Sequence, residues 1–114
     1  MDRLSRRQAI RDYKERKAAP GIYAIRCAPT AEAWVGASRH LDAQQNSAWF
    51  ALRTGGHPNR ALQAAWAAHG EGAFCFQPLE RIDDERLTPL GRDDLVKARE
   101  RHWLAALGAR KATG

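Results

Sequence analysis

Two short runs, Gly21-Ile22-Tyr23 and Trp34-Val35-Gly36, decide the fold of this 114-residue chain. Each lies in an apolar segment that favours β-strand, and the turn-forming stretch Ala28-Pro29-Thr30 separates them. The pattern predicts a β-hairpin with an aromatic side chain on each strand. A third run, Pro78-Leu79-Glu80, ends a later segment of alternating aromatic residues that is predicted to form a third strand.

Four helices are predicted around these strands. A capping-box pattern begins the first at Ser5, and it runs to about Lys17. Apolar residues at helical spacing predict the next two from about 40 to 53 and from about 58 to 69, with glycines at their ends. After an acidic loop over 81–94, the last helix is predicted to begin at Arg92 or Asp93 and to run to 107.

This element order predicts an α+β domain with a small, three-stranded, mainly antiparallel sheet flanked by helices. Residues 1–19 are expected to form a basic N-terminal helical extension, residues 20–107 the domain itself, and residues 108–114 a frayed tail. The length suits a single hydrophobic core. Cys27 and Cys75 lie apart in apolar stretches, and we expect both to be reduced and packed in the core.

The composition favours a globular protein of the cytoplasm. Hydrophobic residues make up 44% and charged residues 28% of the chain. No apolar run approaches the roughly 20 residues that a membrane-spanning helix needs, so no membrane association is expected. The basic N-terminus has no apolar region of the kind that a signal peptide contains.

Positive charge is concentrated at the N-terminus. The formal net charge is +6, and residues 1–19 hold seven Lys and Arg against three Asp and Glu. Such a segment favours polyanions through the release of counterions. We therefore predict nucleic-acid binding by four of its residues, Arg6, Arg7, Arg11 and Lys14. A solvated helix that keeps the protein soluble is the alternative.

The chain resembles the GIY-YIG nuclease family. Gly21-Ile22-Tyr23 matches the first signature of that family fully, and Trp34-Val35-Gly36 matches the second with Trp in place of Tyr. Weaker matches extend the resemblance over about residues 20 to 107: Gly56-His57, Leu62-Gln63 with Trp66, His69-Gly70, Leu79-Glu80, and the helix from Glu100 to Leu107.

The resemblance implies a site for phosphodiester cleavage. In the family, two tyrosines, a helix arginine, a metal-binding glutamate and a late asparagine surround the scissile phosphate. Their positions here are Tyr23, Trp34, Gln44, Glu80 and Arg101, in that order. The resemblance thus implies Mg²⁺ or Mn²⁺ at Glu80 and a base role for Tyr23, direct or through water. It also predicts that Tyr23, Trp34 and Glu80 face one cleft.

Three of these five positions depart from the family pattern. The Trp34 indole donates a hydrogen bond but accepts no proton, and the Gln44 amide carries no charge for a phosphate. Arg39, in the loop after the second signature, is a candidate to replace the lost cation. His57 is a further candidate for nucleic-acid binding, although the His57–Asn59 stretch also suits the capping of the following helix.

Three functions therefore stay open. The first is a nucleic-acid-binding protein that cleaves phosphodiester bonds with a divalent metal. The second is a catalytically inert module that binds DNA or RNA, and the third is a protein-interaction domain whose basic surface meets an acidic partner. The resemblance to nucleases of the homing-endonuclease type favours nucleic acid over protein and DNA over RNA.

Overall fold

The structure is a computed structural model, and it describes residues 19–82 and 87–112. The predicted N-terminal helix therefore lies outside the described residues. The described elements follow the order β1 (Gly21–Cys27), β2 (Glu32–Ser38), α2 (Leu41–Thr54), α3 (Arg60–His69), the short 3₁₀ helix η1 (Glu71–Ala73), β3 (Phe74–Arg81), α4 (Pro89–Leu107) and β4 (Arg110–Lys111). The α+β class predicted from the sequence is confirmed.

The predicted hairpin is present. β1 and β2 pair antiparallel, with Tyr23 opposite Gly36 and Ile25 opposite Trp34. The backbone N–H of Glu32 donates to the Thr30 hydroxyl, 3.2 Å away, and closes the turn between the strands. β3 pairs antiparallel with the other edge of β1, which therefore lies inside the sheet.

The sheet has four strands in the order β3-β1-β2-β4, not the three that the sequence predicts. The fourth, β4, pairs parallel with β2 at Trp34 and Val35 and comes from residues expected to fray. Gly108 ends α4 in the left-handed conformation (φ 57°) and lets the chain turn back toward the sheet. A two-residue strand has too few positions for an alternating pattern, so the sequence carries no signal for it.

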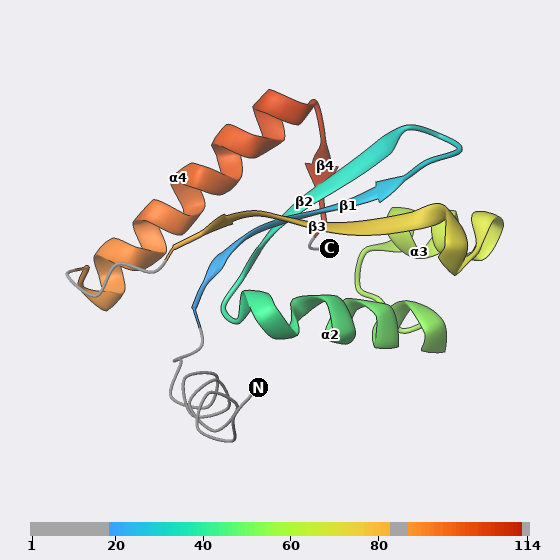
Figure 1. The fold of residues 1–114 in the computed structure, drawn as a ribbon, viewed down its shortest axis with the longest axis horizontal. Coiled ribbons are helices and arrows are strands. Elements are labelled where there is room, and N and C mark those ends of the chain that lie inside the picture. The colour runs from blue at the N-terminus through green and yellow to red at the C-terminus, as the bar shows by residue number, and fades with distance from the viewer. Residues whose placement is uncertain (1–18, 83–86, 113–114) are drawn as a thin grey trace, which may run out of the picture.

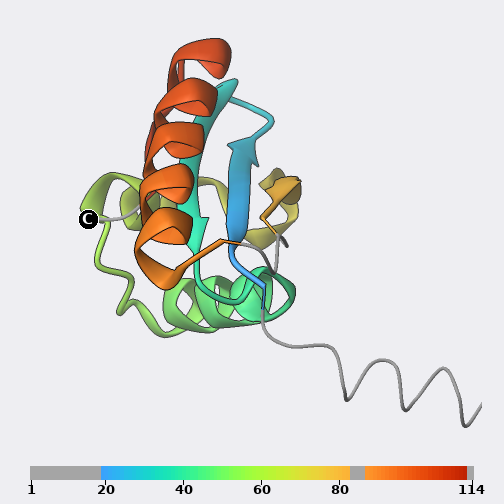
Figure 2. The same ribbon diagram turned by 90° about the vertical axis from the view of Figure 1, so that its left-hand side faces the viewer.

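Helices cover both faces of the sheet (Figures 1 and 2). On one face, side chains of β1, β2 and β3 pack with α2 and α3 in a core built around Ile25, Trp34, Leu52 and Leu62. On the other face, α4 lies across β1 and β2, and its apolar side chains meet a smaller cluster around Ile22, Ala24 and Val35. Odd-numbered residues of β1 thus face α2 and α3, and even-numbered ones face α4.

The helix boundaries differ from the prediction mainly in α4, which begins at Pro89 and not at Arg92 or Asp93. Pro89 occupies the first turn, where a missing N–H costs nothing, and the Thr88 hydroxyl accepts from the Gly91 N–H at 3.0 Å. Cys27 is buried as expected, whereas Cys75 is exposed on β3. Among the described residues, no helix has both the length and the apolar character needed to cross a membrane.

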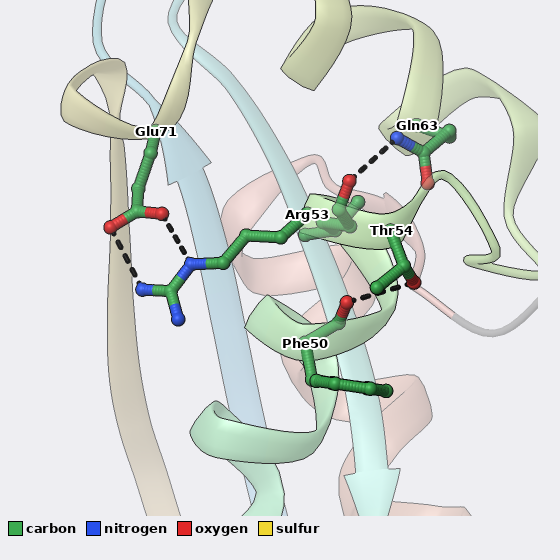
Figure 3. A network of polar contacts seen from close by, with 6 residues as sticks. Phe50, Arg53, Thr54, Gln63 and Glu71 are labelled. Carbon is green, nitrogen blue, oxygen red and sulfur yellow. Dashed lines mark hydrogen bonds and ion pairs between the residues drawn. The ribbon is translucent and has the colours of Figure 1, made fainter.

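Polar contacts fix the α2–α3 layer (Figure 3). Arg53, in the last turn of α2, forms an ion pair with Glu71 in η1, with Nε–Oε1 at 2.6 Å. Gln63 Nε2 donates to the Leu52 carbonyl at 3.0 Å and joins α3 to α2. Both contacts concern the face of the sheet that is turned away from α4.

Candidate functional site

Tyr23 extends from β1 across β2. Its ring stacks on Phe76, with the centroids 5.3 Å apart and an interplanar angle of 15°. A Cβ atom on Gly36 would lie 2.6 Å from the Tyr23 hydroxyl oxygen, so only glycine leaves room for the phenol. β4 pairs with β2 only at Trp34 and Val35, so among the described residues β2 has an open edge from Gly36 onward. The Tyr23 hydroxyl therefore points toward this open edge.

Burial and a carboxylate control the protonation of this phenol. Tyr23 is only 3% exposed, and this burial, together with the negative charge of Glu100, raises the pKa of Tyr23 to about 12. The hydroxyl is therefore protonated at neutral pH and has a proton to donate to a ligand. A role as base requires that bound cations or substrate lower this pKa.

Glu100, on α4, is the carboxylate whose charge raises the pKa of Tyr23. It is half-buried and lies one turn of α4 from both Val96 and Trp103, which pack on the sheet. Sequence reasoning named no role for Glu100. A signal was present, because the apolar spacing of this helix places position 100 on the sheet-facing side, where a carboxylate is unusual.

Glu80, predicted as the metal ligand, does not share a cleft with Tyr23. Its Oε1 accepts hydrogen bonds from Arg99 Nε at 2.7 Å and from Trp103 Nε1 at 2.9 Å, both on α4. Glu80 therefore points to the α4 face of the sheet, whereas the Tyr23 ring packs on the face of α2 and α3. The prediction of a common cleft for Tyr23, Trp34 and Glu80 is wrong.

A β-bulge is the physical reason. Tyr23 pairs with Pro78 and Ile22 pairs with Glu80, so Leu79 is an extra residue in β3. Strict alternation from Phe76 would place Glu80 on the Tyr23 face, but one inserted residue reverses the faces beyond it. Both Leu79 and Glu80 consequently meet the α4 layer.

The environment of Glu80 is that of a structural ion pair. Burial alone would raise the pKa of Glu80, but the hydrogen bonds from Trp103 and Arg99 outweigh this effect, and the pKa lies below its ordinary value. The carboxylate fixes α4 against β3.

Trp34 lies in the core and not in an open site. Its side chain has no exposed surface, and its ring packs at a tilt against Phe74 with centroids 6.4 Å apart. The indole Nε1 is buried and has no hydrogen-bond partner among the described residues. Trp34 thus takes the position of the second family tyrosine without offering a group to a phosphate.

Gln44 and Arg39, which the sequence predicts near the phosphate, share one cavity. This cavity, of about 360 Å³, lies between the end of β2 and the first turns of α2 and is lined by Ala37, Ser38, Arg39, His40, Ala43, Gln44 and Ser47. It begins one residue after Gly36, beside the open edge of β2. Arg39, the predicted replacement for the missing helix arginine, therefore lines the same cavity as Gln44.

Arg101 lies in a second cavity, on the α4 side of the same edge. This cavity, of about 380 Å³, is lined by Lys97, Glu100, Arg101 and Lys111. It holds three cations and the carboxylate that acts on Tyr23. The sequence analysis did not single out Lys97 or Lys111. The position of Lys111 depends on the strand β4, which was not predicted.

His57 has a structural role in the loop before α3. Its Nδ1 accepts from the Asn59 N–H at 3.0 Å, and its own backbone N–H donates to Gln63 Oε1 at 3.1 Å. Burial lowers the pKa of His57, so the ring is neutral at pH 7. Asn59 caps α3 by accepting from the Leu62 N–H at 3.0 Å. The remaining predicted binding residues, Arg6, Arg7, Arg11 and Lys14, lie outside the described residues.

Comparison with known proteins supports the fold. The hairpin with its two signatures, covered by helices on both faces, defines a GIY-YIG-like fold. Two solved structures of the catalytic domain of the homing endonuclease I-TevI, one of them a glutamate-to-alanine variant, are similar to the chain. The variant has 26% sequence identity to this chain, over 79% of this chain and 84% of its own, and the other structure has 27%, over 78% and 88%; each gives a TM-score of 0.65. No family model matches the chain, and no curated protein sequence is significantly similar to it.

Proposed function

We propose that this chain is a nuclease-like domain that binds nucleic acid, DNA in preference to RNA, and hydrolyses phosphodiester bonds at the open edge of β2. The fold carries the proposal, because it is similar to that of a homing-endonuclease catalytic domain. Two features of the site support it: the Tyr23 hydroxyl crosses Gly36 toward this edge, and the charge of Glu100 on α4 raises the pKa of that hydroxyl.

Glu100 replaces Glu80 in the proposal as the residue that holds a divalent cation, Mg²⁺ or Mn²⁺. No group of three or more His, Cys, Asp or Glu that could hold a metal ion occurs in the described part of the chain. One carboxylate still suits Mg²⁺, which commonly binds through one or two carboxylates, water and the phosphates of the substrate. When bound, such a cation offsets the charge that develops on the phosphate and the leaving group.

The residues of the chain have separate roles. Glu100 has no hydrogen bond or ion pair with another described side chain, so its oxygens are available. Tyr23 orients the attacking water through its hydroxyl. A cation held by Glu100 would remove one cause of the high pKa of the phenol, and the phenolate, formed once the hydroxyl has lost its own proton to solvent, would accept the proton of the attacking water. Gln44 supplies a hydrogen bond without charge.

The test is cleavage of single- and double-stranded oligonucleotides in Mn²⁺. Glu100→Gln and Tyr23→Phe are expected to lower the rate by about 10²-fold or more, the effect typical of a preorganised group. Gln44→Arg is expected to raise it, because a fixed cation stabilises developing charge. Glu80→Gln is the matched control and is expected to retain cleavage, since Glu80 binds Arg99 and Trp103. Loss of cleavage in Glu80→Gln but not in Glu100→Gln would contradict these assignments.

An inert nucleic-acid-binding module is the second candidate. Two observations favour it: Gln44 is neutral, and Trp34 is fully buried at the position of the second family tyrosine. Binding without cleavage, in both the parent chain and Gln44→Arg, is the result that this candidate predicts.

A further inference from the structure

The cavity between α4 and β4 has a charge balance that suits an anion. Lys97 and Arg101 come from α4 and Lys111 from β4, and they surround a single carboxylate, Glu100. None of the three cations forms a hydrogen bond or ion pair through its side chain with another described residue. By contrast, Arg99 on the same helix is held by Glu80 at 2.7 Å. The cavity therefore gathers cations whose charge is not used to stabilise the fold.

The sheet and α3 hold Lys111 in place. β4 pairs with β2 so that Lys111 is opposite Val35, whose side chain faces α4. The Lys111 carbonyl accepts from Asn59 Nδ2 at 2.7 Å, and the Ala112 N–H donates to the Val35 carbonyl at 2.8 Å. Because neighbouring residues on paired strands share a face, the Lys111 side chain is directed to α4.

The same cavity adjoins the proposed site. Glu100 forms part of its wall and also acts on the Tyr23 phenol, so an anion in the cavity lies on the α4 side of the open β2 edge. On the α2 side of this edge, Gln44 occurs where the family has an arginine. The α2-side cavity thus has one arginine, Arg39, whereas the α4-side cavity has three cations, Lys97, Arg101 and Lys111.

We propose that Lys97, Arg101 and Lys111 bind a backbone phosphate of nucleic acid and supply the charge that Gln44 lacks. The inference rests on the proposed function, which it deepens by assigning the phosphate contact to α4 and β4. Arg101 offers a planar pair of N–H donors that suits two phosphate oxygens, and the two lysines act as point charges. Glu100 opposes an anion in this cavity as long as no cation neutralises it.

The test measures the affinity for a fluorescent DNA duplex with the full chain in EDTA, at several salt concentrations. EDTA prevents metal-dependent cleavage, so the assay reports binding alone. Arg101→Gln and Lys111→Gln each remove one cation from a different element and are expected to make the log–log salt slope shallower by about 1. Glu100→Gln is expected to tighten binding, because it removes the negative charge from the cavity.

Arg53→Gln is the matched control. It removes one positive charge on the other face of the sheet, where Arg53 is paired with Glu71 (Figure 3). It is expected to leave the salt slope close to that of the parent chain. Thermal unfolding of each variant checks that the fold is kept, and Lys97→Gln provides a further position on α4.

The outcomes separate this inference from the proposed function. Slopes and affinities of Arg101→Gln and Lys111→Gln that equal those of Arg53→Gln would overturn the phosphate assignment, even if the parent chain cleaves DNA in Mn²⁺. Weaker binding by these two variants, with tighter binding by Glu100→Gln, would support the assignment even if the parent chain cleaves nothing. In the latter case only the catalytic part of the proposed function fails.

Discussion

Glu80 shows how one hydrogen-bonded carboxylate connects two layers of the molecule. Its Oε1 accepts from Arg99 and Trp103, and its side chain is 29% exposed. Glu80→Gln keeps an acceptor for the indole N–H but removes the charge that Arg99 faces. We expect a loss of about 1 kcal/mol in the free energy of unfolding at neutral pH, allowing for the partial exposure of the pair.

The effect of pH on this loss follows from the lowered pKa of Glu80. A carboxyl whose pKa is lower in the folded state stabilises the fold above its ordinary pKa of about 4.3 and loses this contribution as the pH falls through the folded value. The parent chain and Glu80→Gln should therefore converge in stability toward acid pH. Urea unfolding at neutral and acid pH measures this, with Glu71→Gln in the exposed Arg53 pair as the control (Figure 3). A stability difference that does not change with pH would contradict the charged interaction.

At the scale of elements, α3 and β4 depend on one residue, Asn59. Its Oδ1 accepts from the Leu62 N–H and caps α3, while its Nδ2 donates to the Lys111 carbonyl. Asn59→Ser keeps a capping oxygen and removes the donor to β4, whereas Asn59→Ala removes both. We expect Asn59→Ala to cost about 1 kcal/mol more than Asn59→Ser in the free energy of unfolding.

Hydrogen exchange distinguishes the two contacts of Asn59. Both variants should speed the exchange of the Ala112 amide, which donates to Val35, because β4 loses its tie to α3. Only Asn59→Ala should also speed exchange in the first turn of α3. Unchanged protection at Ala112 in both variants would show that strand pairing alone holds β4.

The elements also show what the sequence allowed us to predict. The hairpin and the helices α2 and α3 follow from repeated signals: apolar spacing, and glycines such as Gly55 and Gly70 at helix ends. The bulge at Leu79 and the strand β4 each depend on tertiary pairing and leave no local pattern. The bulge explains the wrong prediction that Glu80 faces the cleft of Tyr23. The strand β4 explains why Lys111 was not predicted as part of the site.

Tyr23 and Glu100 illustrate the same division within the site. Tyr23 was predictable because the signature and the strand pattern agree, and Gly36 provides the space for its ring. Glu100 was not assigned because its partner lies 77 positions earlier in the chain and on another element. The apolar spacing of α4 places position 100 on the sheet-facing side, but which strand residue its charge acts on depends on how α4 packs on the sheet.

At the scale of the whole molecule, the candidate site is a meeting of two layers at one sheet edge. The α2 layer contributes Gln44 and Arg39, and the α4 layer contributes Glu100 and Arg101. Because helices cover both faces of the sheet (Figure 2), the proposed function requires that both layers reach one ligand at the open end of β2. A polymer with regularly spaced phosphates suits such an edge better than a small ligand in an enclosed cavity.

The last prediction concerns the distribution of charge over the whole chain. Residues 1–19 hold seven Lys and Arg against three Asp and Glu, so this segment contributes 7 − 3 = +4 of the net charge of +6. If this segment binds DNA, deletion of residues 1–18 should make the log–log salt slope shallower by several units, about 1 for each phosphate that the segment neutralises. The deletion should leave the difference between Arg101→Gln and the parent chain unchanged if the segment and Arg101 bind different phosphates, because independent contacts contribute additively. Titration of the same DNA duplex in EDTA with the four combinations measures both effects. An unchanged slope after the deletion would show that the whole binding surface lies within residues 19–114. It would favour the alternative that the N-terminal charge keeps the protein soluble.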